Sequence, residues 1–178
     1  MVEQYSLWWM PNPDTEAFNA SQQLIDELAD KYNTPKFDTH ITLIANRPGT
    51  EAEIIQATEQ LASKIKPFKV TLGRTRTTDN LYQSLVAIAA GEELEDAAYI
   101  ARDHWKDNKA TVYRPHLSLL YTENHDPDFK NQLLTEVGDR FKGMTFQADR
   151  IHIFTSVPGI EGISQWKRVA EVLLTGKE

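Results

Sequence analysis

The nine residues YRPHLSLLY, Tyr113–Tyr121, form an apolar stretch that carries one histidine and one serine in its middle. Side chains two residues apart lie on the same face of a β-strand. His116 and Ser118 therefore share one face, whereas Leu117 and Leu119 point to the other side. The stretch predicts a strand that buries its leucine face and presents an imidazole and a hydroxyl on the opposite face.

The same pattern occurs 76 residues earlier in the chain. THITLI, Thr39–Ile44, resembles PHLSLL, Pro115–Leu120, and places His40 and Thr42 on one face of a second strand. A single histidine in an apolar strand is most simply a hydrogen-bonded core residue. Two such strands, each with a hydroxyl two residues after its histidine, favour a common functional role.

Further similarities at this offset indicate an internal duplication. The predicted helix starts Thr50 and Asp126 each follow their histidine by ten residues, and KPFKVTLGR (66–74) aligns with KGMTFQADR (142–150). After a shift in register, NLYQSLVAI (80–88) aligns with SQWKRVAEV (164–172), which sets Tyr82 against Trp166. Each half is thus predicted to comprise a helix, the histidine strand, a helix and a hairpin. If a pseudo-two-fold axis relates the halves, their polar faces meet across one cleft.

The spacing of apolar residues predicts an α+β domain over residues 1–178, with antiparallel sheets backed by helices. Four helices are expected, near residues 15–32, 51–65, 93–105 and 127–141. Seven strand-like stretches are expected, at residues 5–10, 37–45, 68–72, 81–89, 116–121, 145–154 and 166–174.

Composition restricts the partners of this chain. Its net charge of -7 argues against extended nucleic-acid binding, which needs clustered Lys and Arg, but not against a small anionic ligand. There is no cysteine, and no apolar run approaches the roughly 18 residues of a membrane span. The first residues lack the basic and apolar regions of a signal peptide. We therefore expect a cytoplasmic monomer without membrane contact.

Two imidazoles on opposite sides of a reacting atom can act as general base and general acid near neutral pH. The hydroxyls of Thr42 and Ser118 can donate hydrogen bonds to the non-bridging oxygens of a phosphate. In-line displacement at phosphorus uses this arrangement. Two histidines without a third ligand do not make a zinc site, and no GxSxG elbow is present. The pattern favours a phosphoesterase that needs no metal or other cofactor.

The motifs HITL (His40–Leu43) and HLSL (His116–Leu119) resemble the paired signature of the two-histidine (2H) phosphoesterase superfamily. More narrowly, the chain resembles the cyclic phosphodiesterases of plants and fungi. This similarity rests on YSLWWMP, FDTHITLI, NLYQSLV, YRPHLSLLY and WKRVAEVLL, and it covers essentially the whole chain. The resemblance implies a fold of two pseudo-symmetric lobes with the active site between them.

The resemblance also implies a reaction that uses a small cyclic phosphate as substrate. ADP-ribose 1'',2''-cyclic phosphate would be hydrolysed to ADP-ribose 1''-phosphate, in the metabolism of a by-product of tRNA splicing. Nucleoside 2',3'-cyclic phosphates would be opened to 2'-phosphates. By motif position His40 and His116 become the acid–base pair, and Thr42 and Ser118 the phosphate ligands. We assign His116 as base and His40 as acid, although the symmetry of the repeat leaves the reverse order open.

Three aromatic residues match substrate-binding positions of the family less firmly: Tyr121, Tyr82 and Trp8. Each could instead serve ordinary packing. Strand alternation would place Tyr121 on the face opposite His116, so the strand must end or bulge before Tyr121 if it is to reach substrate. The remaining histidines, His104, His125 and His152, lack the motif and are predicted to be structural or surface residues.

Two other functions stay open from the sequence alone. One is a 2H enzyme that acts on RNA 2',3' ends as phosphodiesterase or ligase, which the acidic charge disfavours. The other is a non-catalytic module that binds phosphate ligands, which the presence of two complete motifs disfavours.

Overall fold

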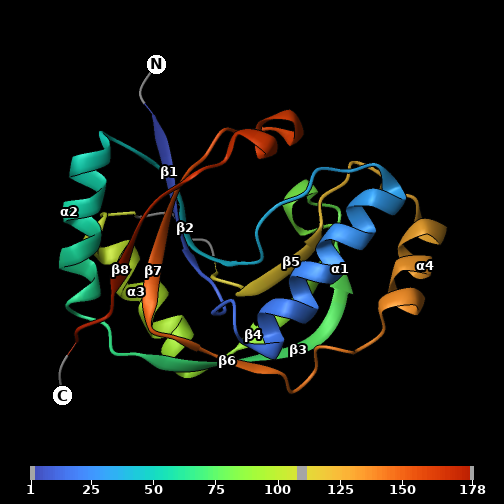
Figure 1. The fold of residues 1–178 in the computed structure, drawn as a ribbon, viewed down its shortest axis with the longest axis horizontal. Coiled ribbons are helices and arrows are strands. Elements are labelled where there is room, and N and C mark those ends of the chain that lie inside the picture. The colour runs from blue at the N-terminus through green and yellow to red at the C-terminus, as the bar shows by residue number, and fades with distance from the viewer. Residues whose placement is uncertain (1–2, 108–111, 177–178) are drawn as a thin grey trace.

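A computed structural model describes residues 3–107 and 112–176, which form an α+β fold built on one antiparallel sheet (Figure 1). The sheet has eight strands in the order β6-β3-β4-β5-β2-β1-β7-β8. The strands are β1 (Gln4–Trp9), β2 (Ile41–Pro48), β3 (Phe68–Thr77), β4 (Leu85–Ala90), β5 (His116–Leu120), β6 (Thr145–Ala148), β7 (Arg150–Thr155) and β8 (Arg168–Leu173).

Three of the four described α-helices follow a residue whose side chain caps them, Thr15, Thr50 or Asp126, whereas the third along the chain follows Gly91 without a side-chain cap. The helices are α1 (Glu16–Tyr32), α2 (Glu51–Ala62), α3 (Glu92–His104) and α4 (Pro127–Val137), with short 3-10 helices η1 (Leu81–Gln83) and η2 (Ile160–Gln165). Thr50 and Glu53 form a capping box at the start of α2. At the start of α4, the Asp126 carboxylate accepts from two backbone N–H groups.

The sheet consists of two four-stranded halves. Lobe one contains β2, β1, β7 and β8, and lobe two contains β5, β4, β3 and β6. The lobes are joined by β2 and β5, which pair only through Ile41 and Leu117. The expected α+β fold, with two pseudo-symmetric antiparallel lobes, is thereby confirmed. The two histidine strands lie side by side at its centre.

The helices cover the two lobes symmetrically (Figure 1). Helices α2 and α3 pack on lobe one, and α1 and α4 pack on lobe two. The apolar residues of the histidine motifs are fully or nearly fully buried, as the alternation predicts. These are Ile41, Leu43, Leu117 and Leu119. Burial of such side chains stabilises the fold by about 1.5–3 kcal/mol each, and it fixes which face of each strand is left for chemistry.

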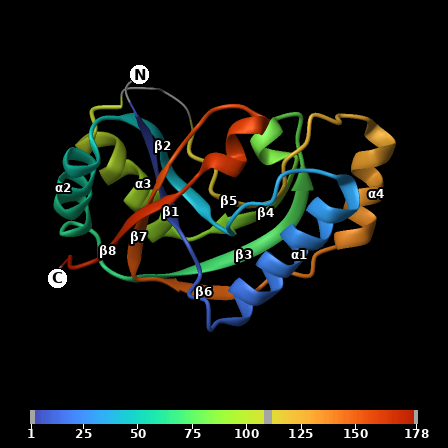
Figure 2. The ribbon, with the colours of Figure 1, turned by 45° about the horizontal axis from the view of Figure 1, so that its top comes forward.

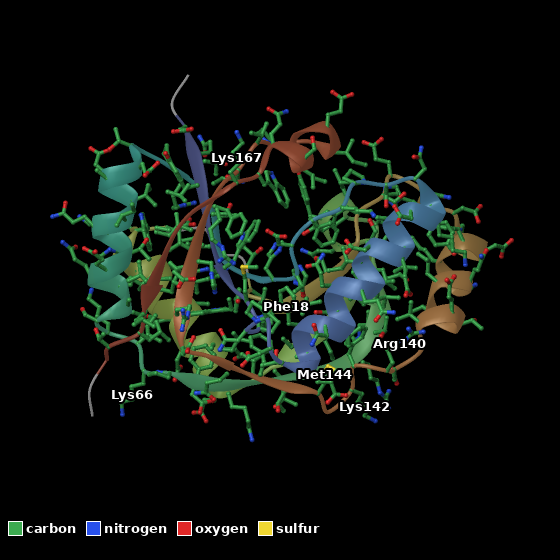
Figure 3. All side chains as sticks on the ribbon, in the orientation of Figure 1. Phe18, Lys66, Arg140, Lys142, Met144 and Lys167 are labelled. Carbon is green, nitrogen blue, oxygen red and sulfur yellow. The ribbon has the colours of Figure 1, made fainter. Side chains whose placement is uncertain are left out.

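The two halves of the sequence repeat do not coincide with the two lobes of the sheet. Residues 145–154 form two strands rather than one, because Asp149 separates β6 from β7. Strand β6 pairs with β3 in lobe two, whereas β7 pairs with β1 in lobe one. Lys66 and Lys142, which precede β3 and β6, both lie at the periphery of the molecule (Figure 3).

The proposed equivalence of β4 and β8 is also wrong. Strand β4 lies next to β5 and therefore corresponds to β1, which lies next to β2. Strand β8 is an edge strand. Within the described residues, no helix is both long and apolar enough to cross a membrane.

Candidate active site

The junction of the two lobes brings the histidine motifs together. The pair Ile41–Leu117 fixes the antiparallel register between β2 and β5. Extended by one residue on either side, this register sets Thr42 opposite His116 and His40 opposite Ser118. Each imidazole therefore faces the hydroxyl-bearing residue of the other motif, as a pseudo-two-fold axis requires.

Each histidine ring makes the same kind of hydrogen bond, to the backbone carbonyl two residues before it. Nδ1 of His40 lies 2.6 Å from the carbonyl oxygen of Asp38, and Nδ1 of His116 lies 2.7 Å from that of Arg114. A carbonyl oxygen only accepts, so Nδ1 must carry the proton in both rings. In the neutral imidazole the lone pair is then on Nε2. The backbone two residues before each histidine thus selects the tautomer suited to proton transfer at Nε2.

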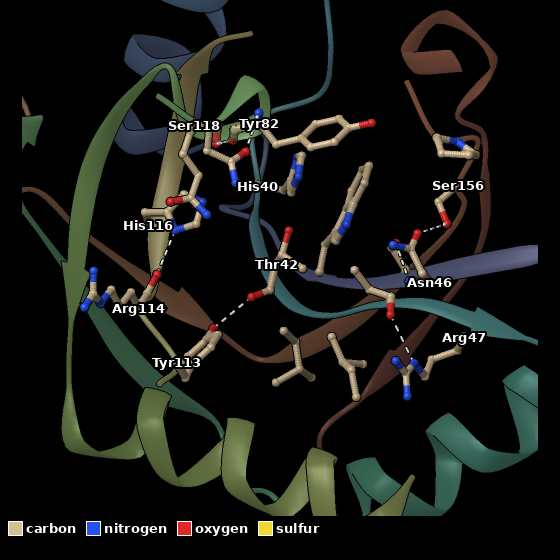
Figure 4. A pocket seen from close by; sticks show the side chains of 18 of the residues that line it. His40, Thr42, Asn46, Arg47, Tyr82, Tyr113, Arg114, His116, Ser118 and Ser156 are labelled. Atoms are coloured by element: carbon tan, nitrogen blue, oxygen red, sulfur yellow. Dashed lines mark hydrogen bonds between the residues drawn. The ribbon is translucent and has the colours of Figure 1, made fainter. Parts of the chain in front are cut away.

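A cavity of about 680 Å³ lies over this junction. Ligand sites typically span roughly 300–1,000 Å³. The walls of this cavity include both motif histidines and both motif hydroxyl residues (Figure 4). The three predicted aromatic residues also line it: Trp8, Tyr82 and Tyr121. All seven residues singled out by the sequence are thus brought to one cavity. Their roles there stay predictions.

The motif hydroxyls differ in their surroundings. Ser118 is buried, and its Oγ donates to the carbonyl oxygen of Tyr82 at 2.8 Å. Thr42 is half-buried, and its backbone carbonyl accepts from the hydroxyl of Tyr113 at 2.8 Å. Ser118 must rotate away from Tyr82 before it can donate to a ligand. The side chain of Thr42 is free of such a bond within the described part of the chain.

Trp8 supports His40 from behind. Its indole ring stacks on the imidazole with a centroid distance of 3.6 Å and an interplanar angle of 10°. The ring of Phe154 stacks near it at 4.0 Å. Trp8 is only 2% exposed. With two rings packed against it, Trp8 is better placed to hold His40 than to stack on a nucleobase.

The remaining aromatic residues gather on one side of the cavity. Strand β5 ends at Leu120, and the pairing of β4 with β5 is irregular near Leu85, so Tyr121 escapes the alternation and turns into the cavity wall. The condition that the sequence set for Tyr121 is therefore met. Tyr121 stacks on Phe37 at 3.9 Å.

Tyr82 reaches across the cleft from lobe two. Its hydroxyl accepts from the backbone N–H of Gly159 at 2.7 Å, and its ring lies 6.3 Å from that of Trp166, at an interplanar angle of 28°. The short helices η1 and η2 that carry these contacts lie side by side above the sheet (Figure 2). Trp166 also lines the cavity but was not predicted as a site residue. The sequence alignment set Trp166 against Tyr82, although the strands that follow the two residues, β8 and β4, are not equivalent in the sheet.

Burial lowers the pKa of both motif histidines. The pKa of His40 falls to about 4, mainly through desolvation, because its side chain is only 4% exposed. The carbonyl of Asp38 opposes this shift and the nearby His116 adds to it. Desolvation also lowers the pKa of His116. Both imidazoles are therefore neutral at neutral pH in the empty cavity, with Nε2 able to accept a proton.

A third buried histidine lies behind the site. His152 pairs with Trp8 across the sheet, is 5% exposed, and has no hydrogen-bond partner for either ring nitrogen among the described residues. Desolvation is the main cause that lowers its pKa to about 4, and Arg168 adds to the effect. It does not line the cavity, and its structural role stays a prediction.

These depressed pKa values predict a loss of stability in mild acid. The unfolded chain binds protons near pH 6.5, whereas folded His40 and His152 bind them only near pH 4. The free energy of unfolding should therefore fall as the pH drops through this window. Urea unfolding at several pH values between 5 and 6.5 measures the slope. His152→Gln should lower that slope by about one proton. An equal slope in the wild type and in His152→Gln would contradict the prediction.

Within residues 3–107 and 112–176, no three His, Cys, Asp or Glu side chains are grouped so that they could hold a metal ion. The described residues thus give this cavity hydrogen-bonding groups and two imidazoles with accessible lone pairs.

Comparison with known proteins agrees with this geometry. The sequence model of the 2'-5' RNA ligase superfamily matches residues 13–158, which include both histidine motifs. The chain belongs to the 2'-5' RNA ligase superfamily. The resemblance to the two-histidine phosphoesterases that the motifs indicated is thereby confirmed.

Individual members of the superfamily are similar over nearly the whole chain. A cyclic phosphodiesterase of Arabidopsis thaliana is 24% identical over 169 residues, which cover 93% of this chain and 92% of that protein. The structure of TT0787 of Thermus thermophilus superposes with a TM-score of 0.71 at 15% identity and covers 98% of this chain and 100% of its own. Apo LigT of E. coli has a TM-score of 0.64 at 14% identity, with 98% and 99% coverage. LigT has also been solved with phosphate and with 3'-AMP.

Proposed function

We propose that this protein is a metal-independent cyclic phosphodiesterase. It hydrolyses ADP-ribose 1'',2''-cyclic phosphate to ADP-ribose 1''-phosphate, and nucleoside 2',3'-cyclic phosphates to nucleoside 2'-phosphates. His40 and His116 are the acid–base pair, and the hydroxyls of Thr42 and Ser118 bind the phosphate. Family membership and the plant relative support a phosphodiesterase; the substrates and the residue roles are our proposal.

One observation carries the proposal. The single pair Ile41–Leu117 sets two imidazoles and two hydroxyl residues around one point, and each imidazole is held in the same tautomer by a backbone carbonyl. The two Nε2 atoms face a bound phosphorus atom from opposite sides, so one ring can accept a proton there and the other, once protonated, can donate one. The ligands in the LigT structures, phosphate and 3'-AMP, are phosphate compounds, as are the proposed substrates.

The reaction follows from this arrangement. One imidazole accepts a proton from water at Nε2 while the water oxygen attacks phosphorus. The bond from phosphorus to the 3' oxygen of the nucleotide (the 2'' oxygen in ADP-ribose 1'',2''-cyclic phosphate) breaks, and the second imidazole, protonated at Nε2, gives its proton to that leaving oxygen. Thr42 and Ser118 donate to the equatorial oxygens, where negative charge gathers in the transition state.

The order of base and acid is biased by burial. Burial lowers the pKa of His40 to about 4 and so favours its neutral form, the form of a base, whereas the sequence assigned His40 as the acid. A bound phosphate anion opposes this bias because it stabilises the imidazolium form of either ring.

The proposed activity is tested by hydrolysis of adenosine 2',3'-cyclic phosphate in the presence of EDTA. We expect turnover that is unaffected by the chelator and that gives adenosine 2'-phosphate as the product, identified by chromatography. A parallel assay uses an RNA oligonucleotide ending in a 2',3'-cyclic phosphate. A clear preference for the oligonucleotide would replace the proposal by the RNA-end enzyme. Tight binding of 2'-AMP without turnover of any cyclic phosphate would indicate a binding module.

A further inference from the structure

The cavity extends well beyond the four motif residues. Thr42 and Asn46 both line it and lie four residues apart on β2. With a rise of about 3.3 Å per residue in a strand, and two irregularities in the pairing of β1 with β2, this separation is on the order of 10 Å. Figure 4 shows Ser118 and His116 on one side of Thr42, and Asn46 and Ser156 on the opposite side. The cavity therefore has a second end at Asn46 and Ser156, which lies beyond Thr42 from Ser118.

A β-bulge forms this second end. Tyr5 pairs with Arg47 and Leu7 pairs with Ile44, so Ser6 alone faces two residues of β2, Ala45 and Asn46. A bulge of this kind bends the strand and redirects a side chain, and bulges are over-represented next to active sites. The backbone of Asn46 is left-handed, with φ of 56°. Glycine adopts this conformation without steric cost, whereas asparagine tolerates it and adds an amide.

Three short polar side chains converge at the bulge. The hydroxyl of Ser6 accepts from the backbone N–H of Asn46 at 3.4 Å, and the hydroxyl of Ser156 lies 3.3 Å from the amide oxygen of Asn46. Ser6 and Ser156 are buried, and all three residues line the cavity. Within the described ranges 3–107 and 112–176, the amide nitrogen of Asn46 has no protein acceptor. The amide thus retains hydrogen-bonding capacity toward a ligand.

The charged residues of the cavity wall indicate what could lie between the reacting phosphate and a group bound at Asn46. The chain carries a net charge of -7, yet among the described residues the charged side chains of the lining are three arginines and one aspartate. Arg47, next to Asn46, holds the carbonyl oxygen of Ala45 through Nε at 3.0 Å and pairs with Asp107 at 3.2 Å. The other two arginines of the lining are Arg102 and Arg114. A local excess of positive charge favours an anion in addition to the reacting phosphate.

We propose that Ser6, Asn46 and Ser156 form a distal subsite for the neutral, hydrogen-bonding end of an extended substrate, a second nucleoside joined through a diphosphate to the ribose that carries the cyclic phosphate. This inference rests on the proposed function and assigns residues that select its extended substrate. A cyclic mononucleotide whose base lies against Tyr82 and Tyr121 has no group that reaches Asn46. The subsite therefore increases the preference for the extended substrate over the cyclic mononucleotide.

Asn46→Gly tests the subsite, because glycine keeps the left-handed backbone and removes only the amide. The readout is the ratio of kcat/KM for ADP-ribose 1'',2''-cyclic phosphate to that for adenosine 2',3'-cyclic phosphate. Loss of one hydrogen bond, about 0.5–1.5 kcal/mol, should lower this ratio about three- to tenfold. Ser156→Ala removes the hydroxyl that contacts the amide and should lower the ratio in the same direction.

Asn33→Gly is the matched control. Asn33 also has a left-handed backbone, with φ of 52°, but it caps the C-terminus of α1 and does not line the cavity. The ratio should be unchanged in this variant. A ratio that is also unchanged in Asn46→Gly, with both substrates turned over, would overturn the distal subsite and leave the proposed function intact.

If the wild type turns over neither substrate, a binding measurement tests the distal subsite separately from the proposed phosphodiesterase activity. 2'-AMP and NADP+ both present a 2'-phosphate on adenosine, and NADP+ adds a diphosphate and a second nucleoside. By calorimetry, Asn46→Gly should weaken NADP+ binding three- to tenfold more than 2'-AMP binding. Equal effects on both ligands, or no binding of NADP+ by the wild type, would overturn the subsite without reference to catalysis.

Discussion

Replacement of His40 or His116 by alanine is expected to lower kcat for adenosine 2',3'-cyclic phosphate by roughly 10²–10⁴-fold, the range of general acid–base catalysis by one side chain. Each variant removes one of the two Nε2 atoms on which proton transfer depends. In His40→Ala the remaining imidazole cannot serve both sides of the phosphorus atom. The double variant should be little worse than either single one, because the two groups act in the same step.

His125→Ala is the matched control for this pair. His125 is exposed, lies outside the cavity and lacks the motif. Because His40 stacks on Trp8, its removal also leaves a gap in the wall. Thermal unfolding and near-ultraviolet circular dichroism must therefore show that His40→Ala is folded. A folded variant that keeps more than a tenth of the wild-type kcat would contradict the acid–base assignment.

The pH dependence of the remaining activity carries further information. In the wild type two histidines titrate, so the profile of kcat/KM should have an acidic and a basic limb. Each single variant should lose one limb. The limb lost with His40→Ala identifies whether His40 acts as base or as acid, which the symmetry of the motifs leaves open in the sequence.

The central part of the site could be predicted from the sequence because it depends on local rules. Strand alternation places His40 with Thr42 and His116 with Ser118, and burial of Ile41 and Leu117 fixes the faces. The repeat at 76 residues predicts that the two strands are equivalent. Equivalence about a two-fold axis is sufficient to bring the motifs together, and the structure does so through a single residue pair.

What the sequence could not show depends on pairing between distant strands. Apolar and polar residues alternate in much of 145–154, and no glycine or proline predicts that the chain leaves one lobe for the other at Asp149, between β6 and β7. The bulge at Asn46 arises because Ser6 of β1 faces two residues of β2, a register that no local pattern encodes. Trp166 reaches the cavity only through the path of η2. These features set the shape of the cavity beyond the reacting phosphate.

Removal of the motif hydroxyls is expected to have the second largest effect. Donors aimed at oxygens that gain charge in the transition state typically contribute 10²–10³-fold to kcat each. Thr42→Val keeps the shape of the side chain, and Ser118→Ala removes only the oxygen. We expect each to lower kcat by about 10²-fold in steady-state assays with adenosine 2',3'-cyclic phosphate, and Thr42→Ser to restore most of the rate.

Ser118 needs a sharper test, because its hydroxyl also has a structural partner. In the substrate-free protein it donates to the carbonyl of Tyr82, which holds the segment that contacts Gly159 across the cleft. If Ser118 served only to anchor this segment, Ser118→Ala would weaken 2'-AMP binding and raise KM while kcat stayed near the wild-type value. A phosphate ligand predicts the opposite division, with kcat reduced and KM changed little, because the donor acts on charge that develops in the transition state. Thr135→Val, on the exposed face of α4, controls for loss of a hydroxyl elsewhere. The division between kcat and KM therefore decides whether the serine that interrupts the apolar stretch YRPHLSLLY contacts substrate or only supports the cavity wall.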